Sequence, residues 1–258
     1  MTQRSIKRIA LITMIIDHIG AHIPGLPIWF RYIGRISAPL FVFCCVHSLD
    51  NTKSKRRFVI RLYLASLIMS LGNILVHLIL GGDGFIPSNN MFLTMFIGSI
   101  AVIVIQKWKV KGLAIFCIYQ CVLCFIYIMI DYIPHFRGLP YRYFDYLFPT
   151  ITGLAYTTEY GVTFVLLFVL MFYMKDNPML LSALMLLCAY GQYKVSHRVN
   201  PMMLENILGC WKMQYLMLFS LPIMLLYNGK KGKGSKYFYY IFYPLHVWIL
   251  IIIENTCF

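Results

Sequence analysis

Long apolar segments recur along the whole chain, and they constrain its fold more than any other feature. A helix needs about 20 mostly apolar residues to cross the hydrocarbon core of a membrane. Of the 258 residues, 60% are hydrophobic and only 12% are charged, so little is left over for a soluble domain. The predicted membrane-spanning segments are residues 7–23, 32–49, 59–80, 91–106, 112–131, 160–174, 179–193, 213–227 and 237–254.

These segments predict an all-α fold, because a helix satisfies its own backbone hydrogen bonds where lipid offers none. We expect a polytopic transmembrane helical bundle of about nine spans, or ten, that forms one integral domain over residues 1–258 and lies in the cytoplasmic membrane. The count depends on residues 132–158, which are rich in Tyr and Pro. We interpret that stretch as a long outer loop with a re-entrant or surface helix, because a tenth span would invert every later segment.

The net charge of +14 has a topological explanation. Cytoplasmic loops of membrane proteins carry an excess of Lys and Arg, and most basic residues here fall between apolar segments. Counting them predicts a cytoplasmic N-terminus and no nucleic-acid partner. The predicted inner cations are Arg4, Lys7, Arg8, Lys53, Lys55, Arg56, Arg57, Arg61, Lys107, Lys109, Lys111, Lys175, Lys230, Lys231, Lys233 and Lys236.

The cysteines do not predict a metal site or a disulfide framework. Most of the eight lie inside apolar segments, where cysteine behaves as a small buried hydrophobic residue. Cys121 and Cys124 are closely spaced but have no partner pair of the kind that zinc requires. We expect no metal, and no cleavable signal peptide, because the first apolar segment has no small-residue cleavage site.

The first apolar segment carries three titratable residues at membrane depth, namely Asp17, His18 and His22. His18 is eleven residues past Lys7, or about 16 Å along a helix axis, which is beyond the middle of the membrane. His22 follows one turn later on the same face. An imidazole exchanges protons near neutral pH and a carboxylate fixes its tautomer, so His18 is a candidate general base. The alternative is a helix end with interfacial polar residues.

Arg31 and Arg35 share one helix face at the outer side of the second segment, where they add nothing to topology. Arg31 is close enough to the interface to reach the headgroups, whereas Arg35 is too deep for that. We expect Arg35 to pair with Asp17 or with an anionic ligand.

Two further groups are candidates. Arg56, Arg57 and Arg61 begin the third segment, where they either set topology only or bind a phosphate-rich cytoplasmic ligand, since Arg matches phosphate geometry. His246 lies about ten residues into the last segment and is either a second site residue or a packing histidine.

Taken together, these segments resemble the TraX family, the membrane acetylases first associated with conjugative pilin. The resemblance runs from near residue 7 to near residue 253 and is weakest over roughly 112–210. It is carried by Asp17 to Gly20, Arg31 to Phe41, Asn90 to Gly98, Leu226 to Gly232 and Lys236 to His246.

The family is in turn distantly similar to acyltransferase-3 membrane enzymes and to the lysosomal heparan glucosaminide acetyltransferase. The spacing of Lys7 and His18 matches a basic residue and a histidine in those proteins, and Arg56 to Arg61 and Tyr243 to His246 match two further motifs. The resemblance implies an acetyl-CoA co-substrate bound by Lys7, Arg8, Arg56, Arg57 and Arg61. It also implies catalytic roles for His18, Asp17, Arg35 and His246, and substrate contacts for Arg31 and His22.

The favoured function is therefore an acetyl-CoA-dependent O- or N-acyltransferase. It would acetylate a pilin-like or secreted peptide, or a glycan, at the outer face. The main alternative is a transporter or flippase of an anionic lipid or metabolite, with the intramembrane His and Arg residues lining its pathway. A non-catalytic scaffold is disfavoured by the buried ionisable residues.

Overall fold

A computed structural model describes residues 1–80, 90–131, 139–198, 213–233 and 237–257, and all regular elements in these ranges are helices. The predicted all-α fold is confirmed. The chain divides into two compact units: unit 1 comprises Met1–Asn51, Leu170–Pro201 and Cys210–Phe258, and unit 2 comprises Thr52–Val169 and Met202–Gly209. The single domain over 1–258 stays a prediction. Lys236 and residues 132–138 lie outside the described ranges.

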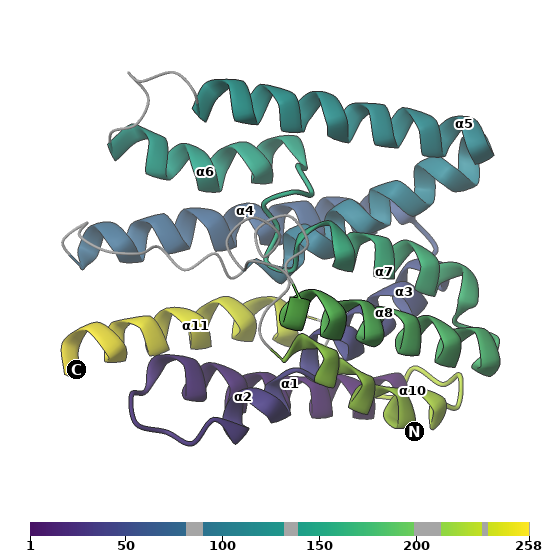
Figure 1. Cartoon of the computed structure of the whole chain (residues 1–258), viewed down its shortest axis with the longest axis horizontal. Coiled ribbons are helices and arrows are strands. Elements are labelled where there is room, and N and C mark those ends of the chain that lie inside the picture. The colour runs from purple at the N-terminus through teal and green to yellow at the C-terminus, as the bar shows by residue number, and fades with distance from the viewer. Residues whose placement is uncertain (81–89, 132–138, 199–212, 234–236, 258) are drawn as a thin grey trace. The chain divides into compact units, whose positions relative to one another are not determined.

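Unit 1 is built around its first helix. Its elements are α1 (Gln3–His22), α2 (Trp29–Gly34), α3 (Ser37–Asp50), α8 (Pro178–Arg198), the 3₁₀ helix η2 (Gln214–Ser220), α10 (Leu221–Leu225) and α11 (Phe238–Cys257). The Thr2 hydroxyl accepts from Ser5 N at 3.2 Å and caps α1. The buried residues of α1 recur every three or four positions, so one face of the helix is buried throughout. That face packs against α2, α3 and α11 (Figure 1).

Hydrogen bonds gather the predicted inner segments at one end of unit 1. Gln3 N donates to Lys230 O at 2.9 Å, and Asn228 N donates to Met1 O at 2.9 Å. Lys175 forms an ion pair with Asp50 at 3.1 Å, which joins the end of α3 to the turn before α8. At the far ends of α1 and α11, His22 contacts Glu254.

Unit 2 contains α4 (Lys55–Ile79), α5 (Met91–Asp131), α6 (Leu139–Thr152) and the first part of α7 (Gly161–Met174). The chain of α5 reverses at Lys109, which has φ 53° and ψ −128°, so α5 is two antiparallel arms (Figure 1). The arms meet closely at Gly112, where a Cβ would lie 2.3 Å from the Val104 carbonyl oxygen. The reversal falls between the predicted spans 91–106 and 112–131.

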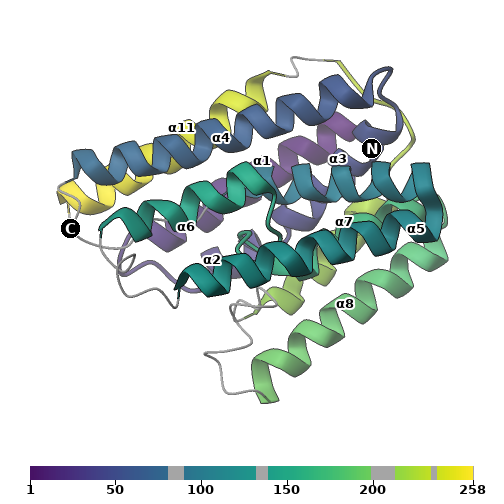
Figure 2. The ribbon, with the colours of Figure 1, turned by 90° about the horizontal axis from the view of Figure 1, so that it is seen from above.

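The described part of the stretch 132–158 contains α6, which lies alongside both α4 and the second arm of α5 (Figure 2). Near its start, Phe144 stacks on Tyr127 with ring centres 6.3 Å apart. At its end, Thr152 O accepts from Tyr119. Its 14 residues span about 21 Å, short of the roughly 30 Å hydrocarbon core. Such a helix is too short to cross on its own, so the re-entrant and the surface interpretations both stay predictions.

Gln120 satisfies the backbone where the chain leaves α6. Its Nε2 donates to Gly153 O at 2.9 Å, and its Oε1 accepts from Ala155 N at 2.9 Å. Gly153 has φ +76°, a conformation that favours glycine. Non-helical backbone within a bundle needs such partners, because lipid supplies none.

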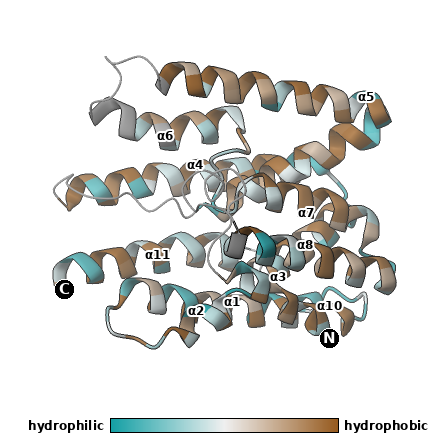
Figure 3. Cartoon of the chain, viewed as in Figure 1, coloured by the Kyte–Doolittle hydropathy of each residue, from teal (hydrophilic) through white to brown (hydrophobic). Residues whose placement is uncertain are grey.

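Within the described ranges, length and composition identify four helices able to cross a membrane: Trp29–Asp50 (α2 with α3), Lys55–Ile79, Met91–Ile130 and Phe238–Cys257. The third covers both arms of α5, and the second arm is apolar along almost its whole length (Figure 3). Gly161–Met174 and Gln214–Leu225 are apolar but shorter. The protein is thus a membrane protein by its apolar helices, whereas nine crossings and a cytoplasmic N-terminus stay predictions.

Candidate functional site

Asp17 lies at the centre of a buried ionic cluster in unit 1. Arg35 Nη2 lies 2.9 and 3.0 Å from its two carboxylate oxygens, and both side chains are nearly inaccessible, at 5% and 6%. Arg31 Nη1 lies 2.9 Å from Oδ1 of the same carboxylate and also donates to Asp17 O. The predicted pairing of Arg35 with Asp17 is therefore formed, and Asp17 holds two arginines rather than a histidine.

The short helix α2 positions both arginines. Arg35 Nε donates to Arg31 O at 3.1 Å, and its Nη1 donates to Gln214 Oε1 at 3.2 Å. Gly34 permits this packing, because a Cβ there would lie 2.1 Å from the Cβ of Asp17. Arg31 is the more open cation, with 25% of its side chain exposed.

His18 pairs with a histidine 228 residues later in the chain. His18 Nδ1 lies 2.8 Å from His246 Nε2, and the two rings are nearly parallel with centres 4.9 Å apart. His246 Nδ1 in turn lies 2.9 Å from Phe242 O on its own helix. His246 is therefore a partner of His18, and both sequence interpretations, a second site residue and a packing histidine, stay predictions.

The carbonyl at the end of this chain of contacts fixes the tautomers. Phe242 O can only accept, so His246 carries its proton on Nδ1 and presents a lone pair at Nε2. With both rings neutral, His18 Nδ1–H donates to that lone pair. The remaining nitrogen of His18, Nε2, then carries a lone pair, which is the form that a general base requires.

His22 contacts an acidic side chain at the end of the cluster. Its Nδ1 lies 2.5 Å from Glu254 Oε2, and the Glu254 side chain is 43% exposed. The sequence interpretation missed Glu254, although it follows His246 by eight residues and so shares its helix face. It also missed Gln214, for which the apolar segment 213–227 gave no signal.

The predicted cofactor cations are divided between the units. In unit 1, Lys7 Nζ lies 5.7 Å from the centre of the Tyr239 ring, and Arg8 is exposed. In unit 2, Arg57 and Arg61 share one face of α4, four residues apart. Arg56 points about 100° away from Arg57, toward the face that carries Val59 and Ile60.

The structure thus brings six of the predicted site residues together around α1: Asp17, His18, His22, Arg31, Arg35 and His246. Within the described residues, no group of three or more His, Cys, Asp or Glu side chains could hold a metal ion. The chemistry available is proton exchange at His18 beside a cluster in which two guanidinium groups face one carboxylate.

A comparison with known proteins supplies the family. No curated protein and no solved structure matches the chain. The family model described as TraX protein matches residues 2–207, a range that includes Asp17, His18, Arg31 and Arg35, while His246 lies beyond its end. Since this match covers most of the 258 residues, the chain belongs to the TraX family, as its sequence motifs predicted.

Proposed function

We propose that this TraX-family protein is an integral membrane acetyltransferase that moves an acetyl group from cytoplasmic acetyl-CoA to an amine or hydroxyl at the outer face. The observation that supports it most is the chain of contacts from His18 through His246 to Phe242 O. This arrangement leaves the Nε2 lone pair of His18 for the acceptor proton.

In the proposed reaction, His18 Nε2 takes the proton of the acceptor N–H or O–H as that atom attacks the thioester carbonyl. The carbon–sulfur bond then breaks, and the coenzyme A thiolate takes the proton from His18. The positive charge on His18 during transfer is shared with His246 through the 2.8 Å contact. General base catalysis of this kind contributes roughly 10²–10⁴-fold.

The ionic cluster supports a role with anionic groups. Asp17 neutralises only one of its two arginines, so Arg31, Arg35 and Asp17 together carry a net positive charge. Arg35 is almost inaccessible and positions Asp17, whereas the more open Arg31 is the cation that would contact an acceptor or a developing oxyanion. His22 would contact the acceptor only after giving up Glu254.

Cations of the predicted inner loops would bind the coenzyme A phosphates. The candidates are Lys7 and Arg8 in unit 1, and Arg57 and Arg61 in unit 2. Replacing each pair with Gln separates the alternatives, because only the pair that contacts phosphate weakens acetyl-CoA binding in a salt-dependent way.

A topology of nine crossings with a cytoplasmic N-terminus is part of the proposal. It is supported in unit 1 by the bonds of residues 1–3 with 228–230 and by the Lys175–Asp50 pair, which join segments predicted to be inner. A single cysteine at position 231 should be modified only by permeant thiol reagents in intact cells. Modification by an impermeant reagent would show that position 231 is outside and would contradict the proposed orientation.

The acceptor is proposed only by class. A pilin-like or secreted peptide would offer an amine and a glycan would offer a hydroxyl, and His18 can take a proton from either. Both classes therefore belong in the assay.

The test uses purified protein and acetyl-CoA labelled in the acetyl group. Binding, thioester hydrolysis and label transfer to peptide and glycan extracts are measured for wild type, His18→Ala and His246→Ala. We expect His18→Ala to bind acetyl-CoA normally and to lose transfer, and His246→Ala to lose less. His47→Gln, a buried histidine of unit 1 outside the cluster, is the matched control and should keep transfer.

Two results would overturn the proposal: wild type that binds no acetyl-CoA, or His18→Ala that transfers label as well as wild type. Movement of an anionic lipid or metabolite across proteoliposomes without acetyl-CoA would favour the transporter instead.

A further inference from the structure

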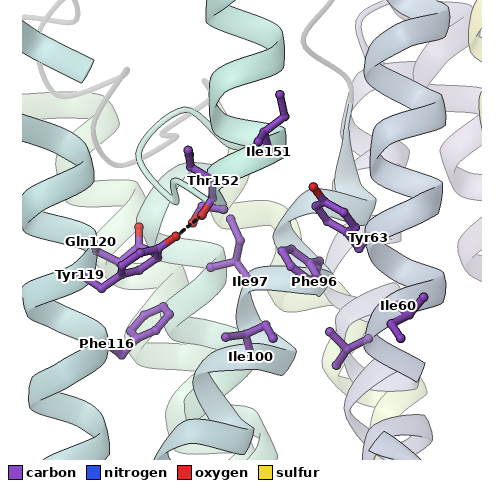
Figure 4. Close-up of a pocket in the computed structure, with 12 residues that line it drawn as sticks. Ile60, Tyr63, Phe96, Ile97, Ile100, Phe116, Tyr119, Gln120, Ile151 and Thr152 are labelled. Carbon is purple, nitrogen blue, oxygen red and sulfur yellow. Dashed lines mark hydrogen bonds between the residues drawn. The ribbon is translucent and has the colours of Figure 1, made fainter. Parts of the chain in front are cut away.

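Unit 2 contains a cavity that the proposed reaction does not use. Its volume is about 400 Å³, within the range of roughly 300–1,000 Å³ that is usual for small-molecule sites. The walls come from α4, both arms of α5 and the end of α6 (Figure 4). The lining is mainly aliphatic and aromatic, including Ile60, Ile97, Ile100, Phe116 and Ile151.

The polar groups of the cavity are mostly committed to the protein. The Tyr119 hydroxyl donates to Thr152 O (Figure 4), and both polar atoms of Gln120 bond the backbone at Gly153 and Ala155. A ligand in this cavity would therefore gain few hydrogen bonds, so its chemistry is that of an apolar chain.

The cavity lies beside a surface of exposed apolar side chains. Ile60, Tyr119 and Ile151 line it and are 43%, 46% and 58% exposed. The second arm of α5, which supplies Phe116 and Tyr119, exposes large apolar side chains such as Ile115, Ile118 and Val122. An apolar face of this kind contacts lipid tails in a bilayer, so acyl chains are the apolar molecules within reach.

Two cations, Arg56 and Lys107, lie next to the cavity along its helices and form what we call the basic rim. Arg56 precedes the lining residues Val59 and Ile60 by three and four positions, so it lies on their face, one turn toward the start of α4. Lys107 follows the lining residue Ile100 by seven positions, or about two turns on the same face. Lys55 donates to Gln106, which fastens the two helices together at this level.

The aromatic residue at the rim is typical of a membrane interface. Trp108 is 46% exposed, and Lys107 Nζ lies 4.6 Å from the centre of its ring. Tryptophan is enriched at headgroup level, so the two cations stand where phosphates lie and the cavity opens one turn deeper.

From this arrangement we infer that unit 2 binds an anionic phospholipid, with its phosphate on Arg56 and Lys107 and one acyl chain in the cavity. Arg57 and Arg61 lie about 100° and 140° around α4 from Arg56, and they remain the candidates for coenzyme A in unit 2. The inference does not depend on the proposed acetyl transfer, because it uses neither His18 nor its cluster.

The test is native mass spectrometry of delipidated protein with phosphatidylglycerol or phosphatidylcholine of identical chains. Wild type should retain one phosphatidylglycerol and less phosphatidylcholine. Ile60→Trp and Ile151→Trp, on two walls of the cavity, should remove the retained lipid. Ile68→Trp, an exposed position of α4 outside the cavity, should retain it.

The rim is tested with Arg56→Gln and Lys107→Gln. Each should lower phosphatidylglycerol binding roughly fivefold, the effect of about one cation on an anionic headgroup, and leave phosphatidylcholine binding unchanged. Lys230→Gln, in an exposed loop of unit 1, is the charge control.

Three outcomes would overturn the inference. One is wild type that retains neither lipid. Another is binding that survives both tryptophan variants. The third is displacement of the lipid by acetyl-CoA, which would assign the rim to the cofactor.

Discussion

The two units bury polar groups of different kinds. In unit 1 the buried contacts include ions and imidazoles, namely Asp17 with two arginines and His18 with His246, beside a neutral bond from Gln3 Nε2 to Cys44 O. In unit 2 they join neutral groups. Ser70 and Thr150 hydroxyls lie 2.7 Å apart, and Asn90 Nδ2 donates to Ser66 O at 3.0 Å and to Ser70 Oγ at 2.9 Å.

The difference is that between a candidate reaction site in unit 1 and structural hydrogen bonds in unit 2. Ionisable groups within membrane helices are costly and mark functional sites, whereas neutral hydrogen bonds between helices contribute on average about 0.6 kcal/mol. Unit 1 keeps charges that the proposed proton transfer and anion binding would use. Unit 2 fastens α4 to α6 with hydroxyls and amides and surrounds an apolar cavity. Removing one partner should therefore cost much more in unit 1.

Asp17→Ala should have the largest effect on stability. It would leave the buried Arg35 and the half-buried Arg31 without their carboxylate, and breaking a buried ion pair costs about 3–5 kcal/mol. Thermal unfolding in detergent measures the loss, and Arg35→Met in the same chain should restore part of it. A loss as small as that of a surface pair would mean that water already reaches the cluster.

Gly34→Ala should disturb the same cluster without removing a charge. The added Cβ would lie 2.1 Å from Asp17 Cβ, so α2 must shift, at a cost of about 1–3 kcal/mol. Gly191→Ala is the matched control, because nothing lies within 4 Å of its added methyl group and α8 should gain slightly. Equal melting temperatures for the two variants would contradict the close approach of α2 to α1.

Asn90→Ala tests the neutral network of unit 2. It removes the bonds to Ser66 and Ser70 and the contact of its Oδ1 with Leu93 N at the start of α5. We expect a loss of about 1 kcal/mol, well below that of Asp17→Ala. If the two losses were equal, the contrast between the units would not hold.

Lys175→Gln should have the smallest effect, and that effect depends on pH. Burial opposes the charge of Lys175, but the hydrogen bonds that it donates to Asp176 and Asp50 outweigh burial and raise its pKa above the ordinary 10.5. A raised pKa gives stability that is complete below the unfolded value and is lost as pH rises through the folded one.

The difference in melting temperature between wild type and Lys175→Gln should thus stay constant from about pH 7 to 9 and shrink above roughly pH 10.5. Its size should be below about 1 kcal/mol, since the Asp50 side chain is 43% exposed and that of Asp176 is 77% exposed. A difference that grew with pH would contradict the raised pKa.

Much of the candidate site could be predicted from the sequence. Asp17, His18 and Arg35 stood out because ionisable residues are expensive inside apolar segments. Glu254 and Gln214 did not, because each lies at the end of its segment, where a polar residue is ordinary. The pairing of His18 with His246 had no local signal, since 227 residues separate them and only the packing of α1 against α11 joins them.

The sequence by itself determined the helical fold, the TraX family and the residues that needed a partner, because apolar periodicity and the cost of buried charge act locally along the chain. Only the tertiary structure decided which partners they found. Asp17 pairs with two arginines, and His18 pairs with His246 instead. The bond from His246 Nδ1 to Phe242 O fixes the tautomers of both rings. Such choices depend on distances between helices, which the order of residues does not contain.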